Sequence, residues 1–209
     1  MTDFRAVQPV GVTLLGLGVV GYGVYQAIEK RADLYAKRSG RMITIRHIAV
    51  RDSSRSRQPE IDRSLLCTDP LKAAVASDIS VVIEVMGGEQ PAVDCIRAAL
   101  NAGKHVVTAN KEVMAKYGPE LLTLAQNHGV ELLFEASVGG GIPILAALRR
   151  DMQANEIQKI QAIVNGTTNF ILTAMAHGDS SYEKILAEAQ HLGYAESDPS
   201  ADIDGVDAA

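Results

Sequence analysis

Tryptophan is absent from this 209-residue chain, and cysteine is scarce: the only thiols are those of Cys67 and Cys95. Neither thiol belongs to a Cys-x-x-Cys pair or to a Cys/His ligand pattern, so the sequence predicts neither a disulfide framework nor a zinc site. The five histidines also form no pair at helical or turn spacing. We therefore interpret the histidines as structural or surface residues, and the low thiol content fits a reducing cytoplasm.

Long apolar runs and an excess of positive charge are also lacking. No uninterrupted apolar stretch approaches the ~18 residues that suggest a membrane span. The segment 1–9 contains Asp3 and Arg5 and no apolar core, which argues against a secretory signal. The formal net charge of -5 offers no basic field to a polyanion. We expect a soluble cytoplasmic protein that binds neither nucleic acid nor membranes.

The chain does contain a repeated alternation of short β-branched apolar runs with longer amphipathic stretches. This alternation is typical of βαβ units around a parallel sheet that is buried on both faces. The predicted strands are residues 11–15, 43–50, 81–85, 105–108 and 130–134. The predicted helices are residues 21–37, 70–75, 91–102 and 112–127, with stop signals at Ala102-Gly103 and His128-Gly129. Residues 1–136 are thus predicted to form an α/β domain.

The pattern changes after residue 136. A glycine-rich linker at 137–143 leads into a helix and is followed by no further parallel-sheet repeat. A strand at 159–164 and an amphipathic helix at 181–192 come next, and then an acidic segment that runs to Ala209. We therefore expect a second, smaller domain over residues 137–209.

A glycine motif follows the first predicted strand. Gly16-Leu17-Gly18-Val19-Val20-Gly21 matches G-x-G-x-x-G, a short pattern that gains weight because it lies between a strand and a helix. Gly16 would allow the tight turn, Gly18 the close approach to a pyrophosphate, and Gly21 the packing of helix on strand. The helix amino terminus would supply N–H groups and partial positive charge to the phosphates. The sequence therefore predicts a doubly wound, Rossmann-type dinucleotide-binding domain.

The choice of dinucleotide depends on the residues after the second predicted strand. An acidic residue there would bind the ribose 2′-hydroxyl of NAD, whereas an arginine would accept the 2′-phosphate of NADP. Arg51 stands at this position, with Arg55 and Arg57 close behind, and these residues favour NADP. Asp52 leaves NAD open, and the arginines could also be no more than solvated loop residues.

Two further strands are predicted to end at the same edge of the sheet. Met86 and Gly87 follow one of them, and Thr108 and Lys111 end or follow the other. Ligands bind at the carboxyl edge of such sheets, so all four are candidate cofactor contacts. The ammonium of Lys111 would lie beside the nicotinamide, where it could hold a substrate carboxylate or polarise a carbonyl. The alternative is that Lys111 is a solvated residue at the start of a helix.

Seven segments in order resemble the homoserine dehydrogenase family. They are GLGVVG (16–21), EVMGG (84–88), TANK (108–111), EASVGGGIP (135–143), NGTTNFIL (165–172), GYAESDP (193–199) and DIDGVD (202–207). The resemblance extends over nearly the whole chain, and the last two segments are not shared by Rossmann enzymes in general. It implies an α/β nucleotide-binding domain followed by part of an α+β substrate and dimerisation domain.

The family interconverts L-aspartate 4-semialdehyde and L-homoserine with NAD(P) in threonine, methionine and isoleucine biosynthesis. By resemblance, Glu196 and Asp202 are the acids that bind the amino-acid substrate, and Asp207 lies near the reacting hydroxyl. Tyr194 and Thr167 are further candidate substrate contacts, and Lys111 is a candidate catalytic residue. The same acids could otherwise belong to a solvated tail. The resemblance also implies a homodimer for the full-length protein.

The resemblance implies a monovalent cation site as well, formed by Glu135, Val138, Gly140 and Ile142. Hard oxygen ligands suit sodium, although the same loop could be only a hinge between domains. The family's catalytic lysine follows the Asp-Gly-x-Asp segment, and the chain ends at Ala209 before that position. Because a missing general acid typically costs ~10²- to 10⁴-fold in rate, we expect this chain alone to be inactive or nearly so.

Three alternatives remain open. One is a Rossmann oxidoreductase of the sugar-dehydrogenase type, which shares the glycine turn and a stretch like residues 102–107. The second, aspartate-semialdehyde dehydrogenase, is disfavoured because its acylating cysteine has no counterpart: Cys67 is expected in a polar loop and Cys95 within a helix. The third is a non-catalytic NADP-binding sensor that has lost the chemistry.

Overall fold

The computed structural model describes residues 9–58, 61–178, 181–192, 194–195 and 199–205. The chain divides into two compact units, residues 1–146 and residues 147–209. Each unit is described by itself below.

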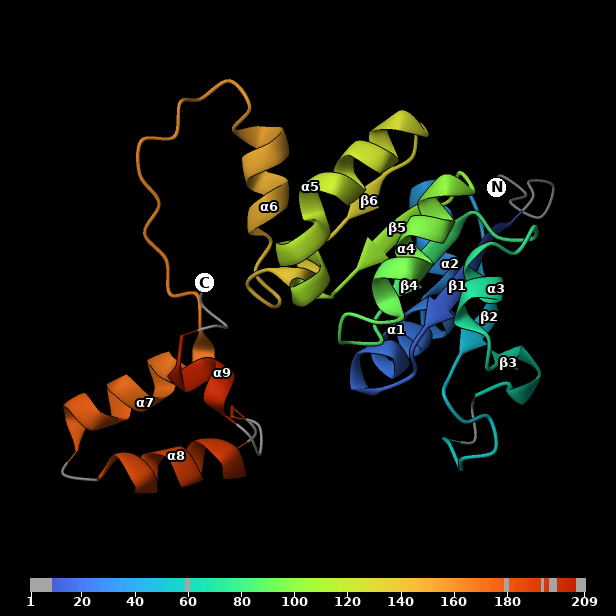
Figure 1. Cartoon of the computed structure of the whole chain (residues 1–209). Helices are drawn as coiled ribbons and strands as arrows, with labels where there is room; N and C mark the ends of the chain where they lie inside the picture. The colour runs from blue at the N-terminus through green and yellow to red at the C-terminus, as the bar shows by residue number, and fades with distance from the viewer. Residues whose placement is uncertain (1–8, 59–60, 179–180, 193, 196–198, 206–209) are drawn as a thin grey trace. The chain divides into compact units, whose positions relative to one another are not determined.

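Unit 1 is built on a six-stranded parallel sheet with the order β3-β2-β1-β4-β5-β6 (Figure 1). Its strands are β1 (Val10–Leu15), β2 (Ile43–Ala49), β3 (Leu66–Cys67), β4 (Val81–Glu84), β5 (His105–Thr108) and β6 (Leu132–Leu133). The chain moves outward from β1 to β3, then crosses back to place β4 on the other side of β1. This doubly wound order confirms the predicted fold class.

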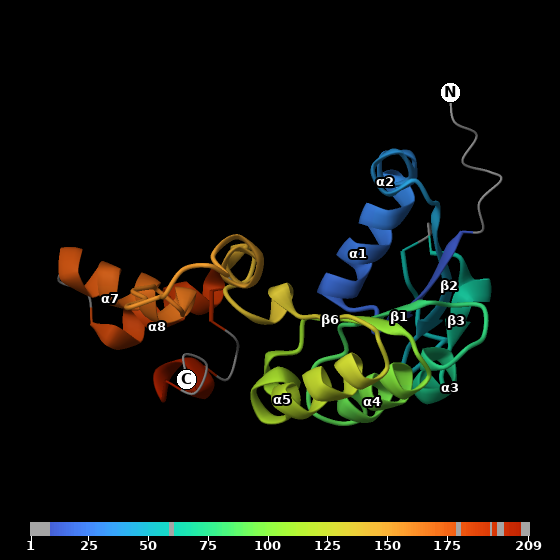
Figure 2. The same ribbon diagram turned by 90° about the horizontal axis from the view of Figure 1, so that it is seen from above.

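Helices cover both faces of the sheet. Figure 2 shows α1 (Val19–Lys30) and α2 (Ala32–Ser39) on one face, and α3 (Pro70–Ala74), α4 (Ala92–Asn101) and α5 (Lys111–Asn127) on the other. Successive strand residues point to opposite faces, so Leu14 joins the apolar core under α1 and Leu15 joins the core under α4 and α5. The sheet is therefore buried on both sides.

Most predicted elements of unit 1 are present, with two differences. Residues 21–37 were expected to form one helix, but the chain breaks at Arg31, whose φ of -119° and ψ of 19° are not helical. Cys67 was expected in a loop, yet it pairs with Ala49 in the edge strand β3. A strand of two residues is too short to show alternation, so the pattern could not reveal it. The predicted helix stops are confirmed, because Gly103 and Gly129 adopt positive φ.

Unit 2 is helical in its described part. The short α6 (Ile144–Ala146) ends unit 1, and a π-helical turn, Ala147–Asp151, begins unit 2. Three helices follow: α7 (Gly166–His177), α8 (Tyr182–His191) and α9 (Ser200–Ile203). Ile171 of α7 packs on Ile185 and Ala189 of α8 to form a small core. The helix predicted at 181–192 is confirmed as α8, whereas α7 was not predicted.

The strand predicted at 159–164 is wrong. These residues have no regular secondary structure, and Ile160 and Ile163 are 63% and 72% exposed. A strand needs a neighbour to pair its backbone N–H and C=O groups, and the described part of unit 2 contains no other strand. The β-branched composition of residues 159–164 was therefore not sufficient to predict a strand.

Within the described residues, no helix has both the length and the apolar character that crossing a membrane requires.

Candidate functional site

The glycine turn after β1 is shaped by two close backbone approaches. Gly16 has a φ of +101°, and a Cβ atom there would lie 2.7 Å from the carbonyl oxygen of Val85. A Cβ on Gly21 would lie 2.3 Å from the carbonyl oxygen of Gly16. Both positions therefore require glycine, the first for its backbone conformation and the second for packing α1 against the turn.

Gly18 differs because nothing in the described structure lies within 4 Å of the position a Cβ would take. It is the N-cap of α1, and no described side chain caps this helix end. Val19, the first helical residue, is 93% exposed. The first N–H groups of a helix need partners, and an anion at this open helix end would provide them. The turn therefore has the form of a phosphate-binding site.

The ends of β4 and β5 are joined by a buried hydrogen-bond network. The Glu84 carboxylate accepts the Met86 N–H at 2.8 Å and the Thr108 hydroxyl at 2.6 Å. Thr108 Oγ1 also accepts the Asn110 N–H at 3.0 Å. The Asn110 side chain donates to the Gly88 carbonyl at 2.7 Å. Met86, Gly87 and Thr108, which were predicted from position, thus lie in two connected turns.

Glu84 and Asn110 were not predicted as members of this site. The available signal for Glu84 was a carboxylate within a strand that is otherwise apolar, since an acid is rarely fully buried without partners. Lys111 starts α5 directly after the network and is exposed at the same sheet edge.

A second set of contacts connects the turn after β4 to α5. The Glu89 carboxylate accepts from Lys116 Nζ at 2.6 Å and from the Tyr117 hydroxyl. These two hydrogen bonds, that from Lys116 first, lower the pKa of Glu89. Arg97 of α4 lies over the Tyr117 ring, 5.0 Å from its centroid, and pairs with Glu120 at 2.7 Å. The loop that begins with Met86 is therefore anchored at both of its ends.

At the end of β2, the Asp52 carboxylate is hydrogen-bonded within its own loop, whereas Arg51 and Arg55 are exposed. The Asp52 carboxylate accepts from the N–H and the hydroxyl of Ser54, at 2.8 Å and 2.6 Å. These bonds lower the pKa of Asp52 and hold the carboxylate within its own loop. Arg57 donates to the Asp52 carbonyl at 2.7 Å. Arg51 and Arg55 are exposed.

Three of the expected substrate residues come together in unit 2. Asn165 caps α7 through Thr168 N at 2.7 Å, and its Nδ2 donates to Asp202 Oδ1 at 2.7 Å. Thr167 of the first turn donates to the Tyr194 carbonyl at 2.6 Å. The remaining two expected acids, Glu196 and Asp207, lie outside the described residues.

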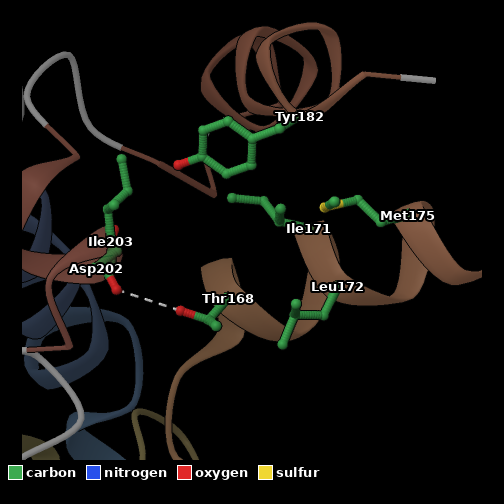
Figure 3. Close-up of a pocket in the computed structure, with 7 residues that line it drawn as sticks. All are labelled: Thr168, Ile171, Leu172, Met175, Tyr182, Asp202 and Ile203. Atoms are coloured by element: carbon green, nitrogen blue, oxygen red, sulfur yellow. Dashed lines mark hydrogen bonds between the residues drawn. The ribbon is translucent and has the colours of Figure 1, made fainter.

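A cavity of about 310 Å³ lies beside Asp202 (Figure 3). It is lined by Thr168, Ile171, Leu172, Met175, Tyr182, Asp202 and Ile203. Thr168 Oγ1 contacts the Asp202 carbonyl at 3.4 Å. Polar groups thus lie at one end of the cavity, and apolar side chains form most of the remainder.

The glycine-rich segment after β6 surrounds a carboxylate that is already engaged. Glu135 accepts from Leu145 N and Ala146 N, each at 2.8 Å, and so caps α6. Gly140, with a φ of +59°, lies in the turn between them, and Val138 and Ile142 are exposed. Among the described residues no cluster of three or more His, Cys, Asp or Glu forms a metal site. A cation here would depend on backbone carbonyl oxygens together with Glu135.

Neither cysteine has the environment of a nucleophile. Cys95 is buried in α4, and burial raises the pKa of its thiol to about 11. Burial also raises the pKa of Cys67 in β3. A protonated thiol is a poor nucleophile, so neither residue supports an acylating mechanism.

Two family models match the chain. "Homoserine dehydrogenase, NAD binding domain" matches residues 16–135, and "Homoserine dehydrogenase" matches residues 143–209. The homoserine dehydrogenase of Bacillus subtilis is 45% identical over 202 residues, which are 97% of this chain and 47% of that protein. That of Corynebacterium glutamicum is 44% identical over 200 residues, 96% and 45% of the two chains. The chain spans about half the length of these curated relatives.

Solved structures of homoserine dehydrogenases are also similar to this chain. A homoserine dehydrogenase from Thiobacillus denitrificans superposes with a TM-score of 0.86 at 43% identity, over 96% of this chain and 46% of that one. A hyperthermophilic archaeal homoserine dehydrogenase in complex with NADPH gives a TM-score of 0.77 at 29% identity, over 96% and 66% of the two chains.

The sheet order and the glycine turn define a nucleotide-binding α/β domain of the Rossmann class. Within that class, the chain belongs to the homoserine dehydrogenase family, a family of oxidoreductases.

We predict opposite effects for alanine at two glycines of α1. Gly21→Ala should destabilise the fold by about 1–3 kcal/mol, because its Cβ must displace the Gly16 carbonyl. Gly23→Ala should leave stability unchanged or raise it by up to ~1 kcal/mol, because its Cβ enters open space in a helix. Urea unfolding followed by circular dichroism measures both. Equal midpoints for the two variants would show that the turn is not tightly packed.

Proposed function

We propose that the chain is the nucleotide-binding domain and part of the catalytic region of a homoserine dehydrogenase. The reaction is the NAD(P)-dependent interconversion of L-aspartate 4-semialdehyde and L-homoserine. The observation that carries the proposal is the open amino terminus of α1 behind the Gly16–Gly18 turn, at the sheet edge where the paired strands β1 and β4 both end. The bound nicotinamide would supply or accept the hydride. The domains we propose are residues 1–136 for the nucleotide and 137–209 for the substrate.

Residues of unit 1 would bind and orient the dinucleotide. Gly16 would shape the phosphate-binding turn, while its own N–H donates to the Ala49 carbonyl at 3.0 Å. The amides from Leu17 to Gly21, including those of Val19 and Val20, would face the pyrophosphate, because Gly18 leaves its approach open. Met86, Gly87 and Thr108 would contact the nicotinamide end, where their turns are joined through Glu84. Lys111 would act at the same edge as a cation for the substrate carboxylate or carbonyl oxygen.

Residues of unit 2 would bind the amino acid. The carboxylates of Asp202 and Glu196 would pair with the substrate ammonium, and Asp207 would lie near the reacting hydroxyl. The Asn165 side chain holds Asp202 in place by its 2.7 Å hydrogen bond, which supports a fixed role for that carboxylate. Thr167 and Tyr194, joined by a hydrogen bond, would complete the contacts. We also propose a homodimer for the longer protein.

We predict that Gly18→Ala separates nucleotide binding from stability. The added methyl group meets no atom of the described residues, so the free energy of unfolding should stay within about 1 kcal/mol of the wild type, the cost of alanine at an N-cap. It would, however, stand where the pyrophosphate approaches, so NADPH affinity should fall tenfold or more, about 1.4 kcal/mol. Fluorescence titration of the 209-residue chain measures the affinity, with Gly23→Ala as the control. Unchanged NADPH affinity of Gly18→Ala would show that the pyrophosphate does not bind at this turn.

The NADP form of the cofactor is favoured by the β2 loop. Asp52 Oδ1 accepts both hydrogen bonds from Ser54, whereas the Arg51 guanidinium is exposed and can contact a 2′-phosphate. We predict that Arg51→Ala weakens NADPH about tenfold, the size of a lost charge-assisted hydrogen bond, while NADH affinity stays within about twofold. Arg38→Ala, which removes the same charge in the last turn of α2 before β2, is the matched control. Equal losses for NADPH and NADH would contradict the assignment.

A sodium ion fits the loop after β6 in its donor chemistry. Each Glu135 oxygen accepts one N–H and retains a lone pair, and the carbonyls of Val138, Gly140 and Ile142 lie on the adjacent turn. We predict that replacing choline chloride by sodium chloride at equal ionic strength raises the melting temperature of the wild type. Glu135→Gln should abolish this difference, whereas Glu131→Gln should keep it. A sodium effect that survives in Glu135→Gln would place the ion elsewhere.

A further inference from the structure

Glu84 is the last residue of β4 and its side chain is fully buried, with 0% exposure. A buried carboxyl group is costly unless hydrogen-bond donors surround it, and packing alone would favour an apolar residue of similar size. The proposed hydride transfer and substrate binding assign no role to the Glu84 carboxylate. The groups that donate to it belong to two different turns.

Glu84 sets the direction of the Thr108 hydroxyl, whose oxygen can both donate and accept. Its Oε1 accepts the Met86 N–H, and its Oε2 accepts the Thr108 hydroxyl. The hydroxyl hydrogen must therefore point toward Glu84, which leaves a lone pair on Thr108 Oγ1 for the Asn110 N–H. Asn110 in turn holds the Gly88 carbonyl with Nδ2 and caps α5 by accepting the Val113 N–H with Oδ1.

We infer that Glu84 is a positioning residue that fixes the turn after β4 relative to the start of α5, so that Gly87 and Lys111 are presented together to the dinucleotide. The inference rests on the proposed function. Glu84 does not touch the ligand in this account and acts through Thr108 and Asn110. The contacts of Glu89 also join the turn after β4 to α5, but they reach Lys116 and Tyr117, further along the helix, and do not involve Thr108 or Asn110.

The Glu84 carboxylate accepts one hydrogen bond with each of its two oxygens. A glutamine can still accept the Met86 N–H with its carbonyl oxygen and donate to Thr108 Oγ1 with its amide, so Glu84→Gln keeps both contacts with one of them reversed. Glu84→Met removes both acceptors at similar volume, and leaves the Met86 N–H and the Thr108 hydroxyl without this partner. Thr108→Val removes the same link from the other side with little change in volume, and Thr108→Ser restores the hydroxyl.

The test uses the 209-residue chain and two readouts. Without ligand, amide hydrogen exchange of Asn110 and Val113, whose N–H groups donate within the network, should become at least tenfold faster in Glu84→Met and in Thr108→Val, and should return to the wild-type rate in Thr108→Ser. With ligand, NADPH affinity should fall about tenfold in the first two variants. Their combination should cost no more than either alone, because both remove the same link.

Thr13→Val is the matched control. Thr13 is a fully buried threonine of β1 whose hydroxyl donates to the Ala73 carbonyl at 2.8 Å, a bond that does not involve either turn. It should lose stability but keep NADPH affinity and the exchange rates of Asn110 and Val113. If Thr13→Val weakens NADPH as much as Thr108→Val does, the effect is general destabilisation and the inference is wrong.

The two proposals fail in different ways. If the wild-type chain binds no dinucleotide, the proposed function is wrong, and the inference that rests on it is lost. If the wild type binds NADPH and Glu84→Met binds it equally well, with unchanged exchange at Asn110 and Val113, only the positioning role is overturned.

Discussion

The reversal of strand order at β1 is the constraint on which the rest of the structure depends. β1 pairs with β2 on one side and with β4 on the other, and all of these pairings are parallel. After β1 the chain continues into α1 on one face of the sheet, and after β4 it continues into α4 on the other face (Figure 2). Ligands of open α/β sheets bind at the carboxyl edge of the sheet, at such a switch point. The glycine turn, the two turns joined by Glu84 and the exposed Arg51 all belong to this edge.

Features with a strong local physical cause were predictable from the sequence. Gly16 and Gly21 stand where a Cβ would collide with backbone, and Gly103 and Gly129 stand where helices end with positive φ. Apolar runs flanked by such glycines predicted the strands β1, β2, β4, β5 and β6. The same reasoning failed where the outcome depends on a distant partner. Residues 159–164 have strand composition but no described strand beside them.

The link between the two turns shows why part of a site is hidden in a sequence. Glu84 and Thr108 lie 24 positions apart, and only the parallel register of β4 and β5, which pairs them directly, brings carboxylate and hydroxyl together. Asn110 then combines helix capping with the tether to Gly88. Family membership explains which ligand to expect at this edge, whereas the network explains how the edge keeps its shape.

The central claim is that a dinucleotide binds at this edge, and amide chemical shifts in the ¹⁵N-labelled chain test it most directly. On addition of NADPH, the account predicts shifts at Gly16, Gly18, Gly87 and Gly88. Gly40 and Gly103, which precede β2 and β5 at the opposite edge of the sheet, should not move. Shifts at Gly40 and Gly103 with none at Gly16 and Gly18 would contradict the account.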